Sequence, residues 1–344
     1  MAARRRRPRR PAASNQRSAP LVEEPRRRTV AASPTPSERR AHGERIKGLT
    51  DFIEYLGSKE RDLTLLGRGE TSLYHYTNLE GLKGILENHD LWLTHARYSN
   101  DEREITLGLN IAAGAVTSLQ QQPATAASRA YLAQLKALLD PNQSADVYIC
   151  CFCDEGDRLS QWRAYGGDGN GVTLEINPRE FAPFTGYRPT GVLSLWKVHY
   201  DRNKQLALMR DAVEWTFQRY GKRMTPVEAA QVARRIIDFF VPTFKDDGFA
   251  EEQEWRLIFS PMAGAATPRF RVARNMMGRY FSLKELVAAS KSPGGKGWRL
   301  PIRSVRIGPS RHKELNALSA EALLVSAGYE GVIVERSPIA YRGT

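Results

Sequence analysis

Apolar residues recur along the chain at two spacings, which predict two kinds of element. Spacings of three and four residues predict helices over residues 46–56, 79–86, 102–139 with a break near Pro123, 157–165, 203–220, 226–240 and 312–327. Short apolar runs predict strands over residues 72–76, 91–93, 147–153, 172–176, 192–200, 254–259, 302–307 and 331–335. Residues 261–300, rich in Gly, Pro and basic side chains, are expected to form loops with short strands.

The order of these elements favours one fold class. Strands and helices are mixed without the regular alternation of a doubly wound sheet, so we predict an α+β domain over residues 44–344. The run from Val147 to Cys153 is almost continuously apolar, which is typical of a strand buried on both faces. Thr77 and Asn78 precede a helical stripe and are candidates to cap that helix.

Composition excludes several protein classes. The chain has 344 residues, of which 41% are apolar and 26% charged, so collagen, coiled coil and wholesale disorder are unsupported. No apolar run is long enough for a membrane span, and no secretory signal is visible. Cys150, Cys151 and Cys153 are an odd, clustered set, which argues against a disulfide framework and favours a reducing cytoplasm.

The net charge of +13 belongs mainly to the N-terminal tail. Residues 1–45 hold 13 arginines and four glutamates, whereas the remainder carries only +4. We expect residues 1–43 to be disordered, because they cannot bury enough apolar surface. A nucleic-acid or lipid contact, a plain solvated tail, sequence translated from a misassigned start and a transit peptide all remain open.

Familiar catalytic motifs are missing from the sequence. Neither a phosphate-binding loop nor a nucleophile elbow nor a zinc-binding helix motif is present. The glycine-dense residues 166–171 follow a predicted helix and precede a strand, which is the reverse of a phosphate-cradling order, so they indicate a turn. The clustered cysteines lack a fourth ligand at matching spacing, so we expect buried thiols and no metal.

Three polar-aromatic stretches follow or begin predicted strands. The first, Tyr74-His75-Tyr76-Thr77, offers hydrogen-bonding groups and flat rings that suit a planar polar ligand. The alternative, which these residues alone favour, is a strand with a hydrogen-bonded core histidine. The second, residues 157–165, places Ser160, Gln161, Trp162, Arg163 and Tyr165 within six positions. Its alternative is an aromatic stripe packed on the sheet.

The third stretch is acidic and runs from residue 251 to residue 256. In a strand, Glu252 and Glu254 point to the same face, and their repulsion raises the pKa of at least one carboxyl. One of the two is then a candidate acid or hydrogen-bond acceptor, and the alternative is an exposed start of a strand. The three stretches together favour a site.

In this order, the stretches resemble a bacterial family known as domain of unknown function 2971. The similarity includes the Tyr74–Thr77 opening through Trp92, a segment with Asn100, Asp101 and Glu104, residues 159–165, residues 252–256, residues 307–309 and a final segment from Ser337 to Arg342. Ala340 stands where that family has proline. The resemblance covers about residues 72–342 and implies no settled activity.

A more distant resemblance is to ADP-ribosyltransferases of the His-Tyr-Glu type. It implies a mixed or antiparallel sheet core with surrounding helices, and NAD as the substrate. His75 and Thr77 would hold the NAD ribose and carboxamide, Ser160 would bind the carboxamide, and Tyr165 or Trp162 would stack on nicotinamide. Glu254 or Glu252 would bind the ribose 2′-hydroxyl. The candidate NAD-binding residues are therefore His75, Tyr76, Thr77, Ser160, Gln161, Trp162, Arg163 and Tyr165, and the candidate catalytic residues are Glu254, Glu252 and His75.

Two functions follow from this resemblance. The first is an enzyme that cleaves the nicotinamide–ribose bond of NAD, by analogy a toxin or phage-defence effector. The second is a non-catalytic nucleotide- or nucleic-acid-binding protein of the same fold, whose arginine-rich tail contacts phosphate. The acceptor of any ADP-ribose is not evident from the residues.

Overall fold

The computed structural model describes residues 36–59, 72–98, 102–140, 146–188, 190–262, 264, 266–273, 275–289 and 298–341. All of these belong to one unit, residues 34–344. The expected tail lies outside the described residues as far as residue 35, and the first helix begins at Pro36, ahead of the boundary expected at residue 44.

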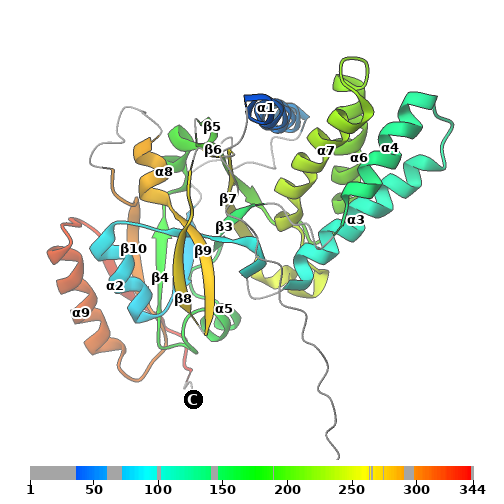
Figure 1. Cartoon of the computed structure of the whole chain (residues 1–344). Helices are drawn as coiled ribbons and strands as arrows, with labels where there is room; N and C mark the ends of the chain where they lie inside the picture. The colour runs from blue at the N-terminus through cyan, green and yellow to red at the C-terminus, as the bar shows by residue number, and fades with distance from the viewer. Residues whose placement is uncertain are drawn as a thin grey trace, which may run out of the picture. The chain divides into compact units, whose positions relative to one another are not determined.

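The strands form one mixed, mostly antiparallel sheet (Figure 1). Its order is β11-β10-β4-β1-β3-β2-β9-β8, and β7, β6 and β5 continue outward from β3. Among the named strands, β10 and β11 are the parallel pair. The strands are β1 Leu73–Thr77, β2 Trp92–His95, β3 Tyr148–Cys153, β4 Val172–Ile176, β5 Gly186–Arg188, β6 Gly191–Lys197, β7 Glu254–Pro261, β8 Arg269–Ala273, β9 Met276–Ser282, β10 Ile302–Ile307 and β11 Ile333–Arg336.

The sheet forks at β3. One edge of this strand pairs with β7 over the whole of Tyr148–Cys153. The other edge is divided, because β2 pairs with Tyr148 and Ile149, while β1 pairs with Cys153. No described strand pairs with residues 150–152 on that edge. β1 and β2 therefore separate from each other over the middle of β3.

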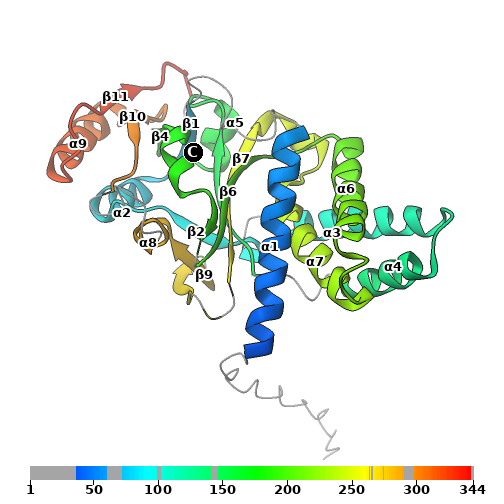
Figure 2. The same ribbon diagram turned by 90° about the horizontal axis from the view of Figure 1, so that it is seen from above.

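Helices pack on both sides of this sheet (Figure 1). Helices α3, α4, α6 and α7 pack together on one side, and α2, α8 and α9 lie on the other. Figure 2 shows α1 running alongside α7, against which it packs. The helices are α1 Pro36–Lys59, α2 Leu79–Asn88, α3 Glu102–Gln120, α4 Ala126–Leu138, α5 Leu159–Ala164, α6 Arg202–Tyr220, α7 Pro226–Phe240, α8 Leu283–Ala289 and α9 Lys313–Ser326.

Two large apolar cores hold these layers. The first joins the helices on one side to the sheet and includes Phe52, Trp196 and Phe240, whose rings are in contact. The second lies under α2, α8 and α9 and includes Leu174 and Val305, both fully buried. Burial of large apolar side chains is the main favourable contribution to folding here.

The predicted α+β class is confirmed, and most predicted elements are present. Strand β4 has the predicted bounds, and the break near Pro123 separates α3 from α4. Asn78 caps α2 by accepting a hydrogen bond from the Gly81 amide (2.7 Å), while Thr77 is the last residue of β1. In the region expected to be loops with short strands, β8 and β9 form a hairpin that is followed by α8.

Candidate functional site

A cavity of about 750 Å³ lies at the fork, and we call it the fork cavity. Its wall comes from β1, the first turns of α2, β2, β3, α5, the start of β7 and Arg271 on β8. This volume lies within the range of small-molecule sites, roughly 300–1,000 Å³. Of the residues predicted from sequence, the lining includes His75, Tyr76, Thr77, Gln161, Tyr165, Glu252 and Glu254.

Glu254 begins β7 and is held by two cations. Arg256 donates Nε–H to Oε1 (2.8 Å) and Nη2–H to Oε2 (2.7 Å), and Lys245 Nζ lies 3.4 Å from Oε2. Burial raises the pKa of Glu254, but Arg256 and Lys245 outweigh that effect and lower the pKa to about 2. The carboxylate is therefore ionised at neutral pH, and its charge is compensated.

Glu252 is not part of the strand, contrary to the prediction. It ends the 3₁₀ helix Asp247–Glu252, and Gln253, with φ of 44°, turns the chain before β7 begins. The two carboxylates nevertheless meet, because Lys245 Nζ pairs with both. Burial raises the pKa of Glu252, and the charge of Glu254 adds to that shift, against the opposing effect of Lys245. The pKa of one carboxyl of the pair is therefore raised, as predicted.

Tyr165 places its ring in the same part of the wall. Its hydroxyl donates to Glu252 Oε1 (3.3 Å), and burial raises the pKa of this phenol. The side chain is 36% exposed, so part of the ring remains accessible to a ligand.

His75 carries a defined tautomer. Its Nδ1 lies 2.9 Å from the carbonyl oxygen of Cys151, on the unpaired edge of β3. A carbonyl only accepts, so Nδ1 carries the hydrogen and Nε2 is left as an acceptor in the neutral ring. Burial lowers the pKa of His75, which keeps the imidazole neutral at pH 7. Within the described residues Nε2 has no hydrogen-bond partner.

Gln161 is buried without a partner for its side chain. It is 5% exposed and lines the fork cavity, yet its carboxamide makes no hydrogen bond within the part of the chain that the structure describes. The amide oxygen and nitrogen are not among the fully buried polar atoms that lack a partner, so both reach the cavity space. They are therefore available to hydrogen-bond with a ligand that carries an amide or a hydroxyl.

The remaining predicted residues do not lie on the cavity wall. Ser160 donates to Glu251 Oε1 (3.1 Å), and Arg163 is exposed on α5. Trp162 is fully buried against Tyr76, with their ring centroids 4.9 Å apart, so it offers no face for stacking on a ligand. The Tyr76 hydroxyl, although its residue lines the cavity, donates to the Glu155 carbonyl and accepts from the Arg158 amide. These two rings are structural.

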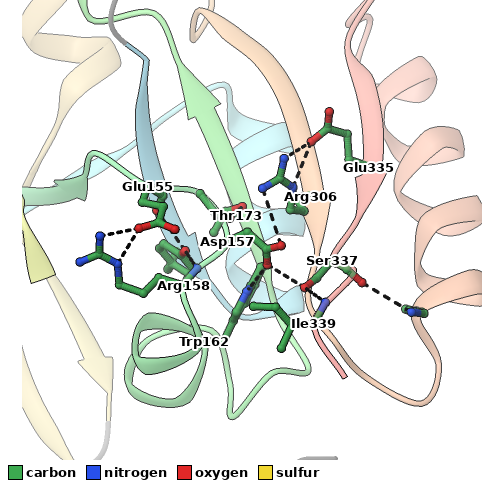
Figure 3. Close-up of polar contacts among 12 residues, drawn as sticks. Glu155, Asp157, Arg158, Trp162, Thr173, Arg306, Glu335, Ser337 and Ile339 are labelled. Atoms are coloured by element: carbon green, nitrogen blue, oxygen red, sulfur yellow. Dashed lines mark hydrogen bonds and ion pairs between the residues drawn. The ribbon is translucent and has the colours of Figure 1, made fainter. Parts of the chain in front are cut away.

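The half-buried carboxylate of Asp157 fixes α5 (Figure 3). Gln161 lies on this helix, and Tyr165 follows its last residue. Oδ1 of Asp157 accepts from Trp162 Nε1 (2.8 Å) and from Ser337 Oγ (2.6 Å). Its Oδ2 lies 3.9 Å from Arg306, which also pairs with Glu335 on β11. The segment after β11 is thereby attached to the base of α5.

The glycine-dense turn after α5 is set by close packing. Gly171 passes so near β1 that a Cβ there would lie 2.2 Å from the Thr77 carbonyl oxygen. The Tyr341 hydroxyl donates to Asp168 on the same turn (2.7 Å). The turn predicted from sequence is therefore present, and it holds α5 beside β1.

Sequence reasoning missed several residues of the wall. Lys245, Arg271 and Trp92 line the fork cavity, and the first of these joins the two carboxylates. Lys245 and Arg271 stand alone in segments without a motif, and only the sheet brings them to the site. The three cysteines are free thiols, as expected, and burial raises the pKa of each.

Some predictions lie outside these observations. Asn100, Asp101 and Arg342 fall outside the described residues, and so does the side chain of Glu104. Among the described residues, no three His, Cys, Asp or Glu side chains gather where they could hold a metal ion. None of the described helices combines the length and apolar character that a membrane crossing requires.

Comparison with known proteins identifies one region. Residues 161–257, from Gln161 on α5 to Leu257 on β7, match the family described as protein of unknown function (DUF2971). The resemblance is thus confirmed for the central part of the chain. No curated protein and no solved structure matches the chain, so the likeness to ADP-ribosyltransferases gains no support there and stays a prediction.

Proposed function

We propose that this protein binds NAD in the fork cavity and cleaves the nicotinamide–ribose bond. One observation carries the proposal: a neutral imidazole, an unpartnered amide and a pair of carboxylates from distant segments line a single cavity. A forked, mostly antiparallel sheet with surrounding helices is compatible with an ADP-ribosyltransferase-like fold.

The side chains suit the two ends of a nicotinamide riboside unit. Gln161 offers both a donor and an acceptor to the ligand carboxamide, in place of Ser160, which points elsewhere. Tyr165 offers a partly exposed ring to the nicotinamide face. His75 Nε2 accepts from a ribose hydroxyl.

The carboxylates suit the charge that cleavage creates. When the bond between the ring nitrogen and the ribose carbon breaks, the electron pair leaves with nicotinamide and positive charge develops on the sugar. A preorganised carboxylate in a cavity with little water stabilises that charge. Glu252 is the candidate for this contact, since among the described residues it pairs with one cation, Lys245, whereas Glu254 pairs with both Lys245 and Arg256. Water or another nucleophile then attaches to the ribose carbon and loses a proton.

The test is nicotinamide release from NAD carrying a label on the nicotinamide ring. We expect the full-length protein to release labelled nicotinamide, and Glu252→Gln to lower the rate at least about 100-fold, as for loss of one transition-state contact. Glu251→Gln is the matched control, because that neighbour bonds to Ser160 and lies off the cavity wall. Equal rates for the two variants would refute a role for Glu252.

A second function is favoured by the compensation of Glu254. Arg256 and Lys245 neutralise this carboxylate, which suits a nucleotide-binding protein that performs no cleavage. In that case the wild-type protein binds NAD but releases no nicotinamide. A contact between the arginine-rich tail and nucleic acid would add to this function, and deletion of residues 1–35 followed by a salt titration tests it.

A further inference from the structure

Arg271 is a cation on the cavity wall that has no anionic partner among the described residues. It is half-buried on β8 and lines the fork cavity. The other lysine and arginine of that wall, Lys245 and Arg256, are both paired with Glu254. Arg271 makes no ion pair within the part of the chain that the structure describes.

Asp90, an acidic residue of the same wall, makes no described ion pair with Arg271. Its Oδ1 accepts a hydrogen bond from the Lys284 amide (2.9 Å) at the start of α8. Burial lowers the pKa of Arg271, and no carboxylate among the described residues offsets that effect. The fold therefore bears the cost of desolvating this guanidinium without an ion pair in return.

The guanidinium is held in one orientation. Its Nη2 donates to Thr94 Oγ1 (2.9 Å), and its central carbon lies 5.3 Å from the centre of the Trp92 ring. Tyr280 packs on the same indole, with the ring centroids 4.4 Å apart. Tyr280 on the neighbouring strand thus fixes Trp92, and Trp92 positions the guanidinium of Arg271. Thr94, which accepts from Arg271, keeps its own hydroxyl hydrogen to donate.

We propose that Arg271 and Thr94 form a subsite for a phosphate group of the ligand. A guanidinium has five N–H donors in a fixed fork, of which the bond to Thr94 uses one, and this geometry matches a tetrahedral oxyanion. An adjacent hydroxyl adds a further donor. That the ligand is a nucleotide rests on the proposed function. The subsite adds that the fork cavity binds phosphorylated nucleotides more tightly than nucleosides.

The experiment is calorimetric titration of the full-length protein with inorganic pyrophosphate, ADP-ribose, adenosine and citrate. We expect Arg271→Gln to weaken binding of pyrophosphate and ADP-ribose about 10- to 100-fold, as for one charge-assisted contact, and to leave adenosine unchanged. Arg269→Gln is the matched control on the same strand, because Arg269 pairs with Glu285 and does not line the cavity. We expect wild-type affinities for it.

Three results would overturn the subsite. They are unchanged pyrophosphate affinity in Arg271→Gln, an equal loss in Arg269→Gln, and a dependence on Arg271 that appears with citrate but not with pyrophosphate. If Arg271→Gln does not fold, Thr94→Val replaces it with the same expected direction and a smaller loss. Absence of nicotinamide release from the wild type, with phosphate binding intact, would end the cleavage proposal and leave this subsite standing.

Discussion

The two charged regions of the fork cavity are built in opposite ways. At the start of β7, Glu254 is enclosed by Arg256 and Lys245, so the buried charges compensate one another. On β8, Arg271 has an indole and a hydroxyl as neighbours and makes no described ion pair. The first arrangement stabilises the fold. The second leaves electrostatic attraction available to a ligand, and this contrast explains why the two regions should respond differently to the same substitution.

The largest difference between the two regions is expected in the free energy of unfolding when Arg256 or Arg271 is replaced by leucine. Arg256→Leu leaves Glu254 buried with only Lys245 nearby, and we expect it to lower the free energy of unfolding by about 3–5 kcal/mol. Arg271→Leu leaves no unpaired anion among the described residues and removes a desolvated charge, so we expect a change within about 1 kcal/mol. Urea unfolding of the two variants measures both values. Similar losses would show that the two regions are energetically alike.

A smaller effect on the free energy of unfolding is expected when the pH is lowered. The pKa of Glu254 in the folded protein, about 2, lies below the ordinary value of 4.5, so this group stabilises the fold above pH 4.5. That stabilisation, about 3 kcal/mol, is lost as the pH falls from about 5 towards 2. The raised pKa of Glu252 acts in the opposite direction.

The matched measurement is the pH dependence of unfolding for wild type and Glu254→Gln. Because carboxylates away from this cluster contribute equally to both proteins, the difference between the two curves reports Glu254 together with its coupling to Glu252. We expect that difference to shrink between pH 5 and pH 2. A constant difference over this range would mean that the carboxylate is not held by Arg256 in solution.

The smallest effect is expected at Thr94. Thr94→Val keeps the shape of the side chain but removes the hydroxyl that accepts a hydrogen bond from Arg271. The expected effect is therefore that of one hydrogen bond. We expect pyrophosphate to bind about two- to tenfold more weakly, with unfolding in urea little changed. Stronger binding would show that the hydroxyl competes with the ligand for the guanidinium.

Local patterns in the sequence were enough to predict most of the fold. The apolar run of β3 and the stripes of α6 and α7 are decided by neighbours in the chain, so their position follows from spacing alone. The fork is a different matter. It arises because β1 and β2 pair with different parts of one edge of β3, and a register of that kind leaves no periodic trace in the sequence.

The lining of the fork cavity was predictable to the extent that its polar residues are concentrated in short stretches. His75, Gln161 and Tyr165 lie on that wall and stand among other polar and aromatic residues in the sequence, while their role as a site stays a prediction. The same reasoning misplaced Trp162, because its buried position depends on Asp157 and on packing against Tyr76. Arg271 left no signal, since its hydrogen-bond partner Thr94 lies 177 positions away in the sequence.

The hydrogen bonds that hold α5 also set an order on the biosynthesis of the site. Ser337 reaches Asp157 over 180 positions, and Tyr341 reaches Asp168 over 173. A ribosome makes the cavity-lining strands and α5 well before it makes either of these donors. Until residues 337–341 have emerged, the nascent chain lacks these two donors, and α5 depends on its packing against Tyr76 and on the bond from Trp162 to Asp157.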